Sequence, residues 1–161
     1  MKTKFFFTII FIAGFITGVS AQPVKKWKYA ELDHYIKQSK TPLVINFWAT
    51  FCKPCVEEIP YFQKAISQYK NKNVKLLLVS LDFPEYYPEK IKAYADKHGF
   101  TAEIIWMDEE DPGQFCPKVD AGWSGVLPAT LFINNKKKYR NFHSQQLSEK
   151  ELQSELEVLT Q

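Results

Sequence analysis

Cysteine is scarce in this sequence: Cys52, Cys55 and Cys116 are the three residues of that type among 161. A small exported domain that depends on disulfides for its fold carries a larger and even-numbered set. A chain of this length can also bury a core without covalent staples. One close pair and one odd thiol therefore indicate chemistry at the pair, within a single self-sufficient domain.

An excess of charge of one sign is also missing. The chain has 21 basic and 18 acidic residues, and cleavage of residues 1–21 would leave 19 and 18. This balance offers no electrostatic reason for binding a polyanion, so no nucleic-acid partner is expected. The one basic run, residues 136–138, follows two asparagines between apolar segments and is typical of a solvated hairpin turn.

Only one apolar run is long, and it lies at the start of the chain. Lys2 and Lys4 precede the run at residues 5–19, and small residues follow up to Ala21. This pattern is typical of a secretory signal peptide, and the run is shorter than the roughly 20 residues of a membrane-spanning helix. We expect cleavage after residue 21 and a domain of residues 22–161; the alternative is an uncleaved membrane anchor.

The apolar patterns of the remaining chain alternate between strand and helix. Strands are expected at residues 43–49, 74–81 and 103–107, and as a hairpin at 129–134 and 137–143. Helices are expected at residues 29–40, from just after 52 to about 69, 87–98, and after the cap at Ser148. Residues 22–28 are expected to be an extended leader, and residues 108–124 irregular with at most one helical turn. This order predicts an α/β fold in which helices flank a mixed central sheet.

The motif Cys52-x-x-Cys55 falls where a buried strand ends and a helix begins. The first turn of a helix has unpaired N–H groups and a partial positive charge, and both stabilise a thiolate. Cys52 at the helix start should be exposed and activated, whereas Cys55 should be more shielded. We therefore assign Cys52 as the nucleophile and Cys55 as the resolving thiol of disulfide exchange.

A C-x-x-C pair can also be half of a metal site. The other ligands would have to be Cys116 and a histidine, but there is no second C-x-x-C and no H-x(3–5)-H spacing. Haem attachment is excluded because Val56, not histidine, follows the pair. No cofactor or metal is expected. Cys116 is interpreted as inert, with a regulatory role as the alternative, and the acidic run at residues 108–111 as a solvated loop.

The segment FWATFCKPC at residues 47–55, followed by Pro60, resembles the thioredoxin active-site segment. The flanking sequences NFW at 46–48 and EEIP at 57–60 resemble the TlpA/ResA-like exported thiol-disulfide oxidoreductases. Residues 125–132, GVLPATLF, resemble the cis-proline loop of that family and the strand after it. The resemblance extends over about residues 40 to 160.

This resemblance implies a thioredoxin fold, with residues 87–107 as an extra βα insertion before the cis-proline loop. It also implies that the Leu127–Pro128 bond is cis, faces the cysteines and lends backbone hydrogen bonds to a substrate strand. Trp48 is expected beside the disulfide, as part of the substrate-binding region or simply as core.

The resemblance further directs attention to Glu58. Thioredoxin has a buried Asp six residues before its first active-site cysteine, where this chain has Asn46. An amide cannot carry the proton that must leave Cys55. Glu58 lies one helical turn beyond Cys55, where relatives carry a Glu, and a buried carboxyl with a raised pKa could act as acid and base. The alternative is that Glu57 and Glu58 are both solvated.

Together these inferences predict an exported, periplasmic protein-disulfide reductase, membrane-anchored if its leader is retained. Its partners would be oxidised protein substrates and, by resemblance, a membrane thiol electron donor. An oxidase or isomerase is an alternative of the same class, because the Lys53-Pro54 dipeptide does not settle the direction of electron flow. A copper-binding metallochaperone or adaptor is an alternative of a different class.

Overall fold

The computed structural model describes residues 23–161, and the expected signal peptide lies outside the described residues. The strands are β1 (Lys25–Trp27), β2 (Leu43–Trp48), β3 (Lys75–Ser80), β4 (Glu103–Met107), β5 (Ala129–Asn134) and β6 (Tyr139–His143). The helices are α1 (Tyr29–Gln38), α2 (Lys53–Gln68), α3 (Glu89–Lys97), α4 (Pro112–Val119) and α5 (Glu149–Thr160). Among these described helices, none combines the length and the apolar character needed to cross a membrane.

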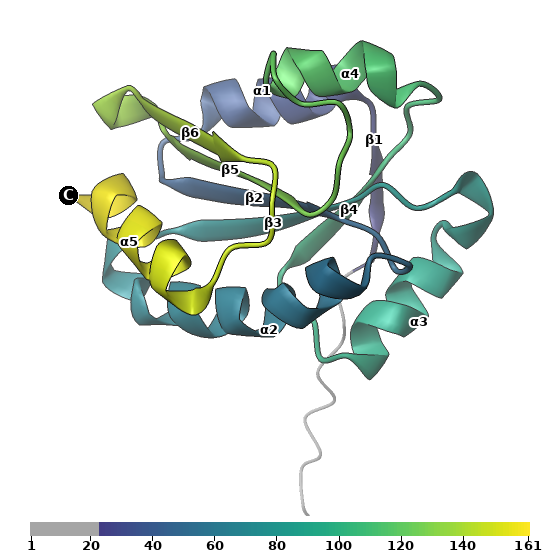
Figure 1. Ribbon diagram of the computed structural model, residues 1–161, viewed down its shortest axis with the longest axis horizontal. Coiled ribbons are helices and arrows are strands. Elements are labelled where there is room, and N and C mark those ends of the chain that lie inside the picture. The colour runs from purple at the N-terminus through teal and green to yellow at the C-terminus, as the bar shows by residue number, and fades with distance from the viewer. Residues whose placement is uncertain (1–22) are drawn as a thin grey trace, which may run out of the picture.

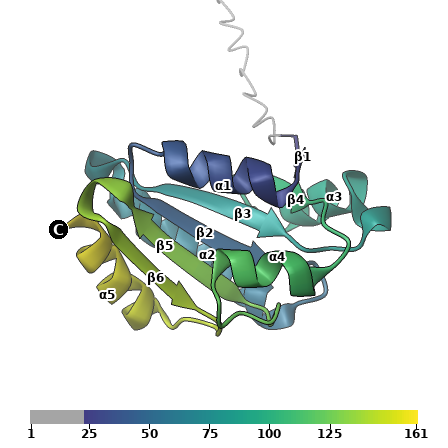
Figure 2. The ribbon, with the colours of Figure 1, turned by 90° about the horizontal axis from the view of Figure 1, so that it is seen from above.

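All six strands form one sheet in the order β1-β4-β3-β2-β5-β6. The pairs β1–β4, β4–β3 and β3–β2 are parallel, whereas β5 runs antiparallel to both β2 and β6. Helices α1 and α4 cover one face, and α2, α3 and α5 cover the other (Figures 1 and 2). The predicted α/β fold with a mixed sheet is confirmed, and α3 with β4 forms the expected insertion.

Strand β2 is buried on both faces, which explains its nearly uninterrupted apolar sequence. Leu43, Ile45 and Phe47 pack under α1 and α4. Val44 and Trp48 point to the opposite face, under α2 and its neighbours. Cys52 follows four residues after the end of β2, so the cysteine pair lies at the carboxyl edge of the parallel strands.

Two segments are more ordered than predicted. The segment predicted as an extended leader contains β1, which pairs with β4 about 80 residues away. Because β1 has only three residues, its sequence shows no periodicity that could have predicted this pairing. The stretch predicted as irregular contains α4, which Asp111 caps by accepting a hydrogen bond from the Gly113 N–H at 2.8 Å. Pro117 inside this helix obscured it in the sequence.

The acidic run at residues 108–111 holds elements together and is more than a solvated loop. Asp108 forms ion pairs with Lys28 at 3.2 Å and Lys26 at 3.7 Å. Glu109 accepts a hydrogen bond from the Tyr29 N–H at 2.7 Å. The run therefore ties the chain after β4 to the start of α1.

The other turns follow the sequence more closely. Residues Asn135–Lys137 form the predicted tight connection between β5 and β6, with Lys138 in the left-handed region at φ 53°. Helix α3 begins two residues later than predicted, after a cis peptide at Tyr87–Pro88. Helix α2 continues without interruption past Pro60.

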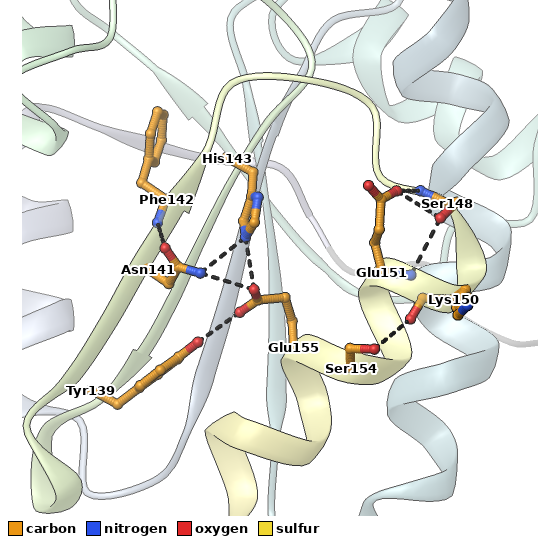
Figure 3. Close-up of polar contacts among 9 residues, drawn as sticks. All are labelled: Tyr139, Asn141, Phe142, His143, Ser148, Lys150, Glu151, Ser154 and Glu155. Carbon is orange, nitrogen blue, oxygen red and sulfur yellow. Dashed lines mark hydrogen bonds and ion pairs between the residues drawn. The ribbon is translucent and has the colours of Figure 1, made fainter.

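Helix α5 begins at the predicted capping box, in which the Ser148 hydroxyl accepts from the Glu151 N–H (Figure 3). Farther along the helix, Glu155 points to β6. Its carboxylate accepts hydrogen bonds from Tyr139 at 2.7 Å and Asn141 at 2.9 Å, and lies 3.0 Å from His143 (Figure 3). These contacts fix α5 against the edge of the sheet.

Candidate active site

A disulfide joins Cys52 to Cys55 at the start of α2, with the two Cα atoms 5.3 Å apart. Cys52 is the N-cap residue of the helix and retains 8% exposure, whereas Cys55 has none. Pro54 occupies the first turn, where its missing N–H costs no hydrogen bond. Cys52 is thus less exposed than predicted, but it is the more accessible residue of the two.

The second element of the site is the loop before β5. Leu127–Pro128 is a cis peptide, as predicted. Because β5 runs antiparallel to β2, its first residue lies beside the end of β2. Leu127 packs against the apolar cluster that contains both active-site cysteines. Farther back, Gly125 has a φ of +93°, and a Cβ there would lie 3.6 Å from the Cys116 sulfur, so this loop rests on α4.

Glu58 is fully buried on the inward face of α2, one helical turn after Cys55. Its Oε1 accepts from the Asn46 amide at 2.7 Å, and its Oε2 accepts from the Leu147 N–H at 3.1 Å. Burial raises the pKa of Glu58 to about 7, although these two hydrogen bonds oppose the shift. The neighbouring Glu57 is exposed and lies 3.7 Å from Lys53. The interpretation of both residues as solvated acids is therefore wrong for Glu58.

Asn46 occupies the position where thioredoxin has a buried Asp, and it links Glu58 to the sheet. Its amide nitrogen also donates to the Thr130 hydroxyl on β5 at 3.0 Å. Its Oδ1 is buried and has no hydrogen-bond partner among the described residues. The Asn46 amide therefore donates one hydrogen bond to Glu58 and one to Thr130, whereas its oxygen accepts none from the described residues. A donor that faces Glu58 favours the ionised carboxylate, which can only accept hydrogen bonds.

Asp82, which the sequence analysis missed, organises the turn before Cys52. Its buried carboxylate accepts from the Thr50 N–H at 3.0 Å and from the Thr50 hydroxyl at 2.6 Å. The Ser80 hydroxyl donates to the same carboxylate at 2.8 Å. The order of the strands could have pointed to Asp82. It follows β3, which runs parallel to β2, so it lies at the same edge of the sheet as the residues that follow β2.

Trp48 does not form part of a surface on which a substrate could bind. Its side chain is fully buried and packs against Tyr94 and Phe100 with ring centroids 6.3 and 5.3 Å apart. The packing alternative stated for this residue therefore fits the structure, and the expected role in substrate binding does not. The insertion supplies this packing, since Tyr94 belongs to α3.

The residues considered for a metal site do not come together. Cys116 is buried in α4, where burial raises its thiol pKa to about 11 and favours the inert interpretation. His34 lies on α1, His98 stacks on Tyr94 at the end of α3, and His143 contacts Glu155 on α5 (Figure 3). Within residues 23–161, no three His, Cys, Asp or Glu side chains are grouped closely enough to hold a metal ion.

The central sheet, the cysteine pair at the start of α2 and the cis-proline loop define a protein of the thioredoxin fold. The AhpC/TSA family matches residues 19–141, so this chain belongs to that family.

Curated proteins to which this chain is similar include two proteins named ResA. Thiol-disulfide oxidoreductase ResA of Geobacillus thermodenitrificans is 29% identical over 115 residues, which are 71% of this chain and 61% of that protein. ResA of Oceanobacillus iheyensis is 49% identical over 91 residues, covering 56% and 43%. The matched region thus spans about three-fifths or less of these relatives' length.

Solved structures show the same fold at low identity. A thioredoxin-related protein from Neisseria meningitidis serogroup B matches with a TM-score of 0.63 and 24% identity, covering 77% of this chain and 89% of that one. StoA from Bacillus subtilis matches with a TM-score of 0.57 and 20% identity, covering 75% and 86%.

Proposed function

We propose that this protein is an exported thiol-disulfide oxidoreductase that reduces disulfides in other proteins. The observation that carries the proposal is the Cys52–Cys55 disulfide, placed at a helix N-terminus with the cis-Pro128 loop beside it. The helix terminus favours a thiolate on Cys52, and its remaining exposure makes Cys52 the attacking residue. The names of the ResA relatives support the same activity.

In the reduced protein, the Cys52 thiolate attacks one sulfur of a substrate disulfide. A bond from Cys52 to that sulfur forms, the substrate S–S bond breaks, and the leaving sulfur takes up a proton. The Cys55 thiolate then attacks Cys52, which restores the Cys52–Cys55 bond and releases the second substrate thiol. Two electrons pass to the substrate, so a dithiol donor must return them, and a membrane thiol donor is the partner we propose.

Glu58 is assigned the proton that Cys55 loses before it attacks. The two residues lie one turn apart on the same face of α2. A buried carboxyl whose pKa is about 7 exists in both protonation states near neutral pH, so it can accept and return a proton. Leu127 and Pro128 are assigned the backbone contact to the substrate strand.

The reduction potential of the Cys52–Cys55 couple tests the direction of electron flow. Thioredoxin has a potential near −270 mV and a strong exported oxidant near −120 mV. We expect a value more negative than roughly −220 mV, together with reduction of insulin that Cys52→Ser abolishes. A matched Cys116→Ser variant should retain activity. A potential near −120 mV would instead indicate that the protein introduces disulfides.

Cleavage of the leader is tested separately by sequencing the N-terminus of the mature protein. The run of apolar residues after Lys2 and Lys4 supports cleavage near Ala21. Retention of Met1 would favour the membrane-anchored alternative.

A further inference from the structure

Trp123 is a buried residue in an otherwise exposed stretch of the loop between α4 and β5. Its side chain is 1% exposed, whereas the neighbouring residues Gly122 and Ser124 are exposed. The Asp120 carbonyl oxygen accepts a hydrogen bond from the Trp123 backbone N–H at 2.9 Å, and the Asp120 carboxylate accepts from the Gly122 N–H at 3.0 Å. These bonds close a turn from which the indole enters the core, so the loop has a fixed anchor.

Aromatic rings from three elements surround the Trp123 indole. Its ring centroid lies 4.5 Å from that of Phe47 on β2, 5.5 Å from that of Phe142 on β6 and 6.1 Å from that of Phe115 on α4. Contacts of this kind hold an aromatic ring in one orientation. Because β2 is also the strand that precedes Cys52, the indole is positioned by the same strand that positions the reactive pair.

One hydrogen bond connects this anchor to the backbone of the cis-proline loop. The Trp123 indole N–H donates to the Val126 carbonyl oxygen at 2.9 Å. The peptide bond between Val126 and Leu127 is trans, so its carbonyl and its N–H point in opposite directions. Since the carbonyl faces the buried indole, the Leu127 N–H faces away from it. Within residues 23–161, this N–H donates no hydrogen bond.

The Leu127 N–H lies close to the reactive cysteines. The Leu127 side chain packs against the apolar cluster that contains Cys52 and Cys55. Pro128 has no N–H, and the next residue, Ala129, already belongs to β5 and pairs with β2. The Leu127 N–H is thus the donor at this point of the loop that an extended substrate segment can reach with a backbone carbonyl, as one strand pairs with another.

We propose that Trp123 is a positioning residue for disulfide exchange, which fixes the Val126–Leu127 peptide so that the Leu127 N–H faces the substrate backbone. This inference rests on the proposed function and adds a residue that acts through the loop. Without the indole N–H, the Val126 carbonyl loses its partner, and the loop can adopt orientations that do not present the Leu127 N–H. A substrate with a peptide backbone should then react more slowly, whereas a small disulfide without amide groups should not.

The test compares two disulfides as oxidants of the reduced protein. One is a cyclic peptide closed by a single disulfide, and the other is hydroxyethyl disulfide, which has no peptide backbone. The measured quantity is the rate constant with the peptide divided by the rate constant with hydroxyethyl disulfide. Both rate constants are obtained by acid quenching and chromatography of the oxidised protein.

Two replacements of Trp123 remove the indole N–H. Trp123→Phe keeps an aromatic ring but is smaller. Trp123→benzothienylalanine keeps the bicyclic shape and has sulfur in place of the N–H, so it tests the hydrogen bond even if the smaller ring destabilises the fold. Trp27→Phe is the matched control, because Trp27 packs on Tyr35 and lies on β1, which three strands separate from β5.

We expect both replacements of Trp123 to lower the ratio about fivefold, the size of effect of one hydrogen bond. The rate constant with hydroxyethyl disulfide should change by less than about twofold, because this disulfide makes no backbone hydrogen bond. Trp27→Phe should keep the wild-type ratio.

An unchanged ratio in the benzothienylalanine protein overturns the positioning role of Trp123. Equal slowing with both disulfides also overturns it, because the replacement would then act on the thiols or on the whole fold. A ratio that falls as far in Trp27→Phe overturns it as well, because loss of aromatic packing anywhere in the core would then suffice. A reduced wild-type protein that reacts with neither disulfide would contradict the proposed function itself.

Discussion

Glu58→Gln removes a buried carboxyl that, within residues 23–161, has no cationic partner at hydrogen-bond distance. The substituted amide has the same shape and can keep both contacts. Its carbonyl can accept from the Leu147 N–H, and its NH₂ group can donate to Asn46 Oδ1 after the Asn46 amide turns over. The Thr130 hydroxyl, which accepts from the Asn46 amide in the wild type, then donates to the same oxygen. The change therefore isolates the ionisation of Glu58 from its packing.

The magnitude follows from the pKa of Glu58, which burial raises from 4.5 to about 7. Between these values the folded protein holds a proton that the unfolded chain has lost, so stability falls as pH rises. Over roughly 2.5 pH units, at about 1.4 kcal/mol per unit, the loss comes to about 3 kcal/mol. The stability that depends on protonated Glu58 is fully present below pH 4.5 and is lost above pH 7. Glu58→Gln should match the wild type near pH 4 and exceed it by up to about 3 kcal/mol near pH 8.

Urea unfolding of the oxidised protein at a series of pH values measures this difference. Glu57→Gln is the matched control, since it makes the same chemical change at the exposed neighbouring position. The control should follow the wild-type pH dependence closely. Parallel stability curves for the wild type and Glu58→Gln between pH 4 and 8 would refute the assignment of a raised pKa to Glu58.

Three further substitutions test the supports of the site. Asp82→Asn should lower the free energy of unfolding by roughly 2 kcal/mol in urea titrations, because Thr50 loses a charged acceptor for two partly buried hydrogen bonds. Gly125→Ala should lower the free energy of unfolding by about 1–2 kcal/mol in the same assay, because a φ of +93° strains any residue with a Cβ. Ser148→Ala should lower the thermal midpoint by several degrees, because the cap that accepts from the Glu151 N–H is worth about 1 kcal/mol (Figure 3).

Two of these substitutions have a matched comparison within the chain. Ser154→Ala makes the same change within α5, where the hydroxyl only donates back to the Lys150 carbonyl, and should be nearly neutral (Figure 3). Gly122→Ala should cost less than Gly125→Ala because Gly122 has no positive φ. A neutral Asp82→Asn would contradict the inferred clamp on the turn before Cys52.

The motif-bearing parts of the fold were predictable because their signals are local. The apolar run at residues 43–49 and the cysteines after it place a strand end, a helix start and the reactive pair within about a dozen residues. The Ser148–Glu151 capping box needs only a spacing of three. The cis peptide at Leu127–Pro128 was predictable in a different way, through resemblance to a family, since no pattern of its neighbours requires it.

What remained hidden depends on partners far apart in the sequence. Asn46 reaches Glu58 across 12 residues and Thr130 across 84, and Leu147 reaches Glu58 across 89. The sequence could identify Glu58 as a candidate from its helical phase, but its burial and its raised pKa require α5 and β5 to close over it.

By itself, then, the sequence determined the chemistry at Cys52 and Cys55 and the alternation of elements that carries it, because periodicity and caps act over one or two turns. Tertiary structure alone decided that Trp48 is buried and that Phe51 stacks on Phe83. It also decided that Asp82 secures the turn before the disulfide. The physical reason is that an apolar pattern records which side of an element is buried, whereas the identity of the neighbour is set only when the strands pair.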